Sequence, residues 1–191
     1  MIHHLFKLCL LCCFCLPVMA QKKANELHFT SSQRQLITVY KGNIFVNGNK
    51  AFVFHEDIIN YPSKRNRLVE DGASVFLFLE VNGSPKKNKL YVFRIDHSLA
   101  DSVLTAISSD VKDYDHDGNL EFGGSEQAPP NPSADTIYYV PSRFYEIRKG
   151  RINFDAALTE TTDKKVNGIY MPDAWDEKGT FQLIPKPKKK H

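Results

Sequence analysis

The stretch DYDHDGNLE, residues 113–121, brings carboxylates together at a spacing that suits a bound cation. Asp113, Asp115 and Asp117 alternate along it, so a tight loop can turn all three toward one centre. Gly118 follows at the sixth position, where a loop of this kind makes its sharpest turn. Calcium is a hard ion that prefers carboxylate and carbonyl oxygens, and it is the ion that this pattern predicts.

The second half of the stretch supplies the other ligands that a calcium ion needs. Asn119, at the seventh position, offers its backbone carbonyl, and Glu121, at the ninth, offers a carboxylate. Four carboxylates this close repel one another without a cation, which indicates a metal site. Calcium is favoured over magnesium because magnesium takes fewer protein ligands. The alternative is an exposed polar turn that binds no ion.

Residues 111–124 resemble two known calcium loops, the EF-hand and the FG-GAP repeat of integrin-type β-propellers. An EF-hand has an acid at its twelfth position and then a helix, whereas this chain has Gly124 there and continues into a proline-rich segment. The FG-GAP resemblance fits better, and it implies a loop between two strands with Glu121 as its last ligand. A propeller needs several blades with a motif in each, so the resemblance covers the loop and not the fold.

Two further groups of polar residues could take part in acid–base chemistry. Residues 55–57 (HED) could act as a general acid and base or bind a second metal, but Ile59 breaks the H-E-x-x-H zinc pattern. Asp96 and His97 could orient a base, yet neighbours in a strand point to opposite faces. We therefore expect a solvated strand end at residues 55–57 and no bond between Asp96 and His97.

The segment 136–147 (TIYYVPSRFYEI) is rich in aromatic residues, which could stack on sugar rings or contact a partner protein. Such rings more often alternate into a β core, and we expect core packing for most of them. Tyr138, Tyr139 and Tyr145 are the candidates for interaction if they are exposed. Trp175 is a further candidate because it sits in a polar segment, although it can also pack against the edge of the domain.

Residues 1–20 are typical of a secretory signal peptide. The run from Leu8 to Ala20 is apolar, shorter than a membrane-spanning helix, and ends in small residues that suit cleavage near Ala20-Gln21. The alternative is a buried helix of the mature fold. Every cysteine of the chain lies in this segment, so the mature chain has no disulfide and no thiolate site. This favours a bacterial periplasm or cell surface over a eukaryotic secretory route.

Composition favours one domain, residues 21–184, followed by a basic tail, residues 185–191 (PKPKKKH), that we expect to be disordered. The formal net charge of the chain is +3, so we expect no general attraction to nucleic acid or to a membrane surface. No second apolar run reaches the length that spans a bilayer.

Alternation of apolar and polar residues, with many β-branched and aromatic side chains, predicts a series of short strands. Glycine-containing turns between them predict antiparallel hairpins. The expected strands are residues 34–40, 44–46 and 51–54 as a meander, 74–83 paired with 89–97, 144–155 turning at Lys149-Gly150, and 179–186. Together they predict a mostly-β antiparallel domain, a sandwich or a small barrel, with at most one or two short helices.

One segment fits two kinds of secondary structure. Ser98 to Asp101 has the form of a capping box, and Leu99, Val103 and Ile107 repeat at helical spacing. The same residues also alternate as in a strand, so we expect a short helical turn that becomes a strand before residue 111. Residues 55–73 and 125–135 are expected to be loops, the second because of its prolines.

These patterns predict a secreted, calcium-binding β domain in which the ion is structural. Such a domain would act as a binding module for an envelope protein or a glycan. Two alternatives stay open at this point. One is an extracytoplasmic hydrolase with the calcium site near its cleft, and the other is a secreted inhibitor or immunity-type protein.

Overall fold

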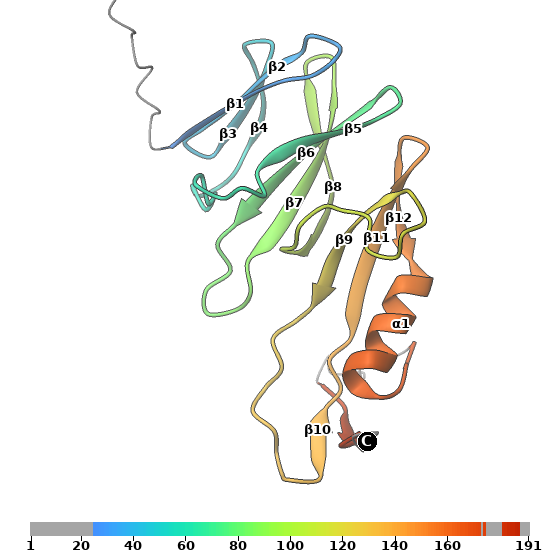
Figure 1. Cartoon of the computed structure of the whole chain (residues 1–191). Coiled ribbons are helices and arrows are strands. Elements are labelled where there is room, and N and C mark those ends of the chain that lie inside the picture. The colour runs from blue at the N-terminus through green and yellow to red at the C-terminus, as the bar shows by residue number, and fades with distance from the viewer. Residues whose placement is uncertain (1–24, 173, 175–180, 188–191) are drawn as a thin grey trace, which may run out of the picture.

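The fold was obtained as a computed structural model, which describes residues 25–172, 174 and 181–187. Within these ranges the chain forms thirteen strands and one helix (Figure 1). The strands are β1 (Glu26–Thr30), β2 (Leu36–Tyr40), β3 (Asn43–Val46), β4 (Asn49–Val53), β5 (Arg67–Asp71), β6 (Ser74–Val81), β7 (Lys89–Asp96), β8 (Leu99–Ile107), β9 (Leu120–Ser125), β10 (Thr136–Tyr138), β11 (Ser142–Arg148), β12 (Arg151–Asp155) and β13 (Leu183–Pro185). The helix is α1 (Ala156–Asn167).

Three open antiparallel sheets pack one after another (Figure 1). We call them the first sheet (β1-β2-β3-β4), the middle sheet (β5-β6-β7-β8) and the outer sheet (β12-β11-β9). The prediction of a mostly-β antiparallel fold is confirmed, and the sheets form a sandwich and not a closed barrel. A separate two-stranded sheet, β10-β13, lies beyond the outer sheet at the end near α1.

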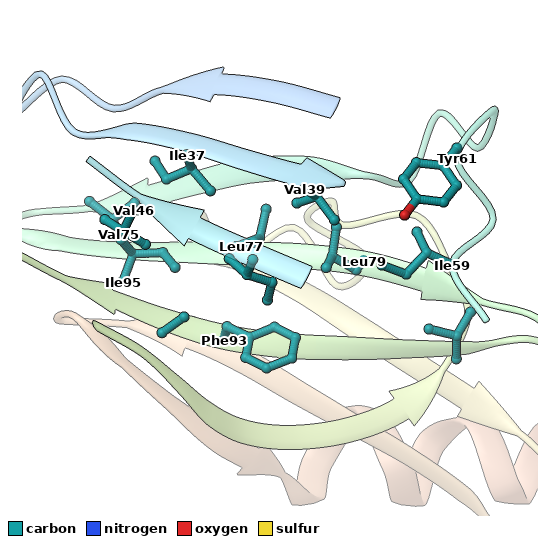
Figure 2. Packing of buried hydrophobic residues seen from close by; sticks show 13 residues of the cluster. Ile37, Val39, Val46, Ile59, Tyr61, Val75, Leu77, Leu79, Phe93 and Ile95 are labelled. Atoms are coloured by element: carbon teal, nitrogen blue, oxygen red, sulfur yellow. The ribbon is translucent and has the colours of Figure 1, made fainter. Parts of the chain in front are cut away.

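The middle sheet is buried on both faces, which explains the sequence of β6, SVFLFLEV. Val75, Leu77 and Leu79 face the first sheet, and Figure 2 shows these side chains in the core between the two sheets. Phe76 and Phe78 point the other way and pack against the outer sheet. Because successive side chains of a strand alternate between faces, a strand covered on both sides is apolar at nearly every position.

The predicted hairpins are confirmed. β2, β3 and β4 form the expected meander, and β6 pairs with β7 and β11 with β12. Lys149 and Gly150 both have positive φ, 52° and 69°, which is the geometry of a tight two-residue hairpin turn. The prediction missed β1, which pairs with β2 along its whole length.

Two segments differ from the expectation. Residues 99–107 form strand β8 from the start, and no helical turn precedes it, because His97 takes φ 51° in a hairpin turn that pairs Leu99 with Asp96. The capping box at Ser98 is therefore a coincidence of composition. Residues 55–73 are not wholly a loop either, since Arg67–Asp71 forms β5 and pairs with β6, which buries Val69.

Helix α1 begins and ends at clear capping residues. The Asp155 side chain accepts a hydrogen bond from the Leu158 N–H at 2.9 Å, which satisfies one of the free donors of the first turn. Gly168 takes φ 79°, and its N–H donates to the Lys164 carbonyl at 3.0 Å.

The buried stripe of α1 is polar and takes the place of a neighbouring strand. β12 ends at Asp155, and beyond that point α1 lies beside the start of β11. Four residues of helix and two of strand both advance about 6 to 7 Å, so every fourth helical side chain meets every second strand amide. The bonds run from backbone N–H to side-chain oxygen: Phe144 to Thr159 (3.1 Å), Ser142 to Asp163 (2.8 Å) and Val140 to Asn167 (3.1 Å).

The predicted last strand is found in part, as β13, which pairs with β10. The predicted signal peptide, residues 1–20, and Trp175 lie outside the described residues. Of the predicted tail, residues 185–191, the part from residue 188 also lies outside them. Pro185 belongs to β13 and Lys186 N–H donates to the Asp135 carbonyl at 2.8 Å, so the start of the segment predicted to be disordered is paired. In the described ranges no helix has the length and apolar character needed to cross a membrane.

Candidate metal site

The acidic loop lies where the chain crosses from the middle sheet to the outer sheet. An isolated antiparallel bridge closes it, with Lys112 N–H donating to the Glu121 carbonyl at 3.1 Å and Glu121 N–H donating to the Lys112 carbonyl at 2.9 Å. Phe122 points to the middle sheet, so its neighbour Glu121 points to the opposite side, which we call the outer face. The Tyr114 ring packs edge-on against Phe144, 5.7 Å between centroids, and holds the loop on this face.

The predicted carboxylates converge. One oxygen from each of Asp113, Asp115, Asp117 and Glu121 lies within 4.8 Å of the corresponding oxygen of the other three. Ligands on opposite sides of a calcium ion are about 5 Å apart, so the cluster has the size that such a coordination sphere requires. These four residues can therefore hold a metal ion.

Backbone donors orient the aspartates. Asp113 accepts hydrogen bonds from the N–H groups of His116 at 2.6 Å and Gly118 at 3.1 Å. Asp117 accepts one from Asn119 N–H at 2.8 Å. Gly118 has φ 93° with open space where a Cβ would lie, so the loop needs glycine there for its backbone angle and not for close contact.

Glu121 is the decisive member of the cluster. Its side chain is 1% exposed, and its Oε2 accepts a hydrogen bond from Tyr114 N–H at 2.6 Å. Its Oε1 is the one buried side-chain oxygen or nitrogen in the described part of the chain that has no hydrogen-bond partner. Burial raises the pKa of Glu121, and the negative charges of the three aspartates raise it further. The hydrogen bond from Tyr114 N–H lowers this pKa, but by less than the other effects raise it.

An oxygen in that state is unfavourable unless a cation or a hydrogen-bond donor such as water lies beside it. Leaving a buried polar atom unsatisfied costs about 1–3 kcal/mol, and more for a charged group. A divalent cation among the four carboxylates offsets both the missing bond and the mutual repulsion. The donor set, all oxygen, is the one that hard cations prefer.

Asn119 and an unpredicted residue, Glu146, border the site. The Asn119 Nδ2 donates to Asp117 Oδ2 at 2.9 Å and to Glu146 Oε1 at 2.7 Å, while the role of its carbonyl as a ligand stays a prediction. Glu146 lies directly opposite Glu121 in the register of β9 and β11. Burial raises the pKa of Glu146. The positive charge of Arg148 lowers this pKa and the negative charge of Asp117 raises it, so the pKa stays above its ordinary value. No spacing in the loop reveals Glu146, because its place depends on strand register.

The aromatic candidates separate into different environments. Tyr139 is fully buried and its hydroxyl donates to Asp163 Oδ2 at 2.6 Å, so its side chain is not available to a partner. Tyr145 is half-buried and stacks on Phe122 at 5.6 Å, and Tyr138 is half-buried beside Phe181. The expectation of core packing is confirmed for Tyr139 and in part for the other two.

The remaining polar candidates lie elsewhere. His55, Glu56 and Asp57 are all exposed, as expected for a solvated strand end. Asp96 and His97 do contact each other, with 2.5 Å between Asp96 Oδ1 and His97 Nδ1, so the prediction that they would not is wrong. His97 sits in the turn after β7 with positive φ, and strand alternation does not apply there.

Fold and site together define a three-layer antiparallel β protein with an acidic, all-oxygen cluster on its outer sheet. No protein-family model, curated protein or solved structure matches this chain.

Proposed function

We propose that this protein is a calcium-binding β domain of the extracytoplasmic space, with the ion as a structural element and the domain as a binding module for an envelope protein or a glycan. The observation that carries the metal assignment is the buried Glu121 carboxylate, whose Oε1 has no hydrogen-bond partner among the described residues and which converges with three aspartates. Calcium is the ion because the four carboxylates, the Asn119 carbonyl and water together supply the six to eight oxygens that it takes.

The position of the loop supports a structural role for the ion. The loop connects β8 at the edge of the middle sheet to β9 at the edge of the outer sheet. An ion that binds there joins residues before and after this crossing. Because it binds the folded state and not the unfolded chain, calcium at about 100 times its Kd adds about 2.7 kcal/mol of stability.

The extracytoplasmic location is supported by the apolar leader, residues 8–20, and by the lack of cysteine after it. Calcium modules in that space work at dissociation constants of about 0.1–1 mM. A loop with three exposed or half-exposed aspartates and one buried glutamate suits that range.

Calorimetric titration and thermal unfolding test the proposal. We expect wild-type protein to bind calcium more tightly than magnesium and to melt several degrees lower in EGTA than in calcium. Asp115→Ala combined with Asp117→Ala should abolish both effects. Glu56→Ala combined with Asp101→Ala removes the same charge from exposed positions elsewhere and should change neither.

Glu121→Gln gives a sharper version of the same test. In EGTA this variant should melt above the wild type because it removes a buried, poorly solvated charge, whereas in calcium it should melt below because it loses a charged ligand. A wild-type protein that shows no heat of calcium binding and melts identically in calcium and EGTA would refute the proposal.

A further inference from the structure

The hairpin that joins β11 to β12 carries a second charged feature, distinct from the acidic loop. Its tip has the sequence RKGR, with cations at Arg148, Lys149 and Arg151. Arg148 and Arg151 lie directly opposite each other in the strand register, so both guanidinium groups are on the same face. That face is the outer face, since Glu146, two residues before Arg148, is opposite Glu121.

This pairing is unfavourable by itself. Like charges directly opposite in a sheet destabilise it, and among the described residues the ion pairing of the two arginines is limited to one long contact between Arg148 and Glu146. Arg148 Nη1 is 3.9 Å from Glu146 Oε1, which is too long for a hydrogen bond, and that oxygen already accepts from Asn119. Among the described residues, the side chains of Arg148, Lys149 and Arg151 make no hydrogen bond, so their donors are free to bind a ligand.

The cations line a hollow. Arg148, Lys149, Arg151 and Asn153 surround a volume of about 390 Å³, and no carboxylate is among the lining residues. Asn153 adds an amide donor from the same face as Arg151. Guanidinium groups bind sulfate, phosphate and carboxylate through paired N–H donors, so two of them side by side suit an oxyanion.

The hairpin is held in place by the middle sheet, so the cations do not have to be ordered by the ligand. Gly150 N–H donates to Asp71 Oδ2 at 2.6 Å, and the Gly150 carbonyl accepts from Ser74 Oγ at 3.0 Å. A Cβ at Gly150 would lie 2.7 Å from Ser74 Oγ, so glycine permits this contact. Binding to a preorganised site costs less entropy than binding that must order a loop.

We propose that the Arg148–Arg151 hairpin binds the anionic groups of an acidic polysaccharide, either sulfate or uronate carboxylate. The hollow has the size of a small-ligand site, which fits one or two sugar units. No aromatic ring lines it, so it lacks the stacking platform of a single-strand nucleic-acid site. The proposal names the glycan partner left open in the proposed function, and it does not depend on calcium binding by the loop.

Binding to oligosaccharides of matched length tests it, with a sulfated heparin-type chain, an oligogalacturonate and a neutral dextran as probes. We expect the wild type to bind one or both acidic chains and not dextran. Arg148→Gln combined with Arg151→Gln should weaken binding about tenfold or more. Lys64→Gln combined with Arg67→Gln removes the same charge from exposed positions and should weaken it by less than about twofold.

Three results would overturn the proposal: equal loss in the two double variants, equal binding of dextran, or preferential binding of a single-stranded oligonucleotide. Arg151→Gln alone should melt no lower than the wild type, because it relieves the repulsion from Arg148. If this single variant binds the acidic chains more weakly, that loss therefore cannot be attributed to unfolding. Calcium binding by the hairpin variants is measured separately. They keep every carboxylate of the loop, so failure at one site is distinguishable from failure at the other.

Discussion

Two buried glutamates, Glu121 and Glu80, show how surroundings decide what a carboxylate does. Glu121 has one hydrogen bond and three negative neighbours, and burial and charge raise its pKa. Burial also acts to raise the pKa of Glu80, but the hydrogen bonds that Glu80 accepts lower it to about 2. Its donors are Ser108, Ser63, Arg65 and Asn60. Glu80 is thus satisfied by the protein, while Glu121 lacks a partner that a cation can supply.

The environment of Glu80 predicts a pH dependence of stability. Its folded pKa is below the ordinary value of 4.5, so its contribution is complete above pH 4.5 and is lost as the pH falls toward about 2. A shift of this size corresponds to about 3 kcal/mol. We expect the unfolding free energy of the wild type, measured with urea, to fall by about that amount across this window.

Glu80→Gln is the matching variant for that measurement. It should be less stable than the wild type at pH 7 and should lose much less stability between pH 4.5 and 2, since it has no carboxyl to protonate. Parallel stability profiles for the two proteins would show that Glu80 does not carry this pH dependence.

At the scale of elements, α1 shows why a helix can be essential without an apolar face. Its buried residues are Thr159, Asp163 and Asn167, and each bonds to the backbone around the start of β11. Asp163 also accepts from the Tyr139 hydroxyl, which links the helix to the small core beyond the outer sheet.

Asp163→Ala should therefore destabilise the protein by about 3 kcal/mol, because it leaves two buried donors, the Tyr139 O–H and the Ser142 N–H, without an acceptor. Asp163→Asn keeps one oxygen acceptor and should cost less. Urea unfolding at pH 7 checks the order wild type, Asn variant, Ala variant. An alanine variant as stable as the wild type would contradict this account of the helix.

The elements that could be predicted were those with strong local signals. The hairpins of β2–β4, β6–β7 and β11–β12 followed from alternation and from glycine turns such as Lys149-Gly150. Helix α1 was missed because its buried stripe is polar, so no apolar period marks it. β8 was partly misread because Leu99 and Val103, both exposed, match a helical and a strand pattern equally well.

The part of the metal site that lies in one local stretch of sequence was also predictable. Asp113 to Glu121 form one continuous stretch, and the structure brings their carboxylates together. Glu146 and the paired arginines of the β11–β12 hairpin come from other parts of the chain, and their place depends on register across the outer sheet. Register of this kind is set by tertiary packing, which no local pattern encodes.

At the scale of the whole molecule, the three sheets differ in how much they depend on the loop. The first and middle sheets share a large apolar core that does not include it (Figure 2). The outer sheet receives its edge strand, β9, directly from the acidic loop, and Glu121 is both a member of the cluster and the second residue of that strand. Calcium should therefore stabilise the outer sheet and leave the first sheet nearly unchanged.

Hydrogen exchange of the amides, measured in calcium and in EGTA, tests this claim most directly. We expect calcium to slow exchange in residues 113–125 and in β11, with little change in β1–β4, and we expect Asp115→Ala with Asp117→Ala to abolish the difference. Exchange that is the same in calcium and EGTA throughout the outer sheet, or that changes equally in all three sheets, would contradict it.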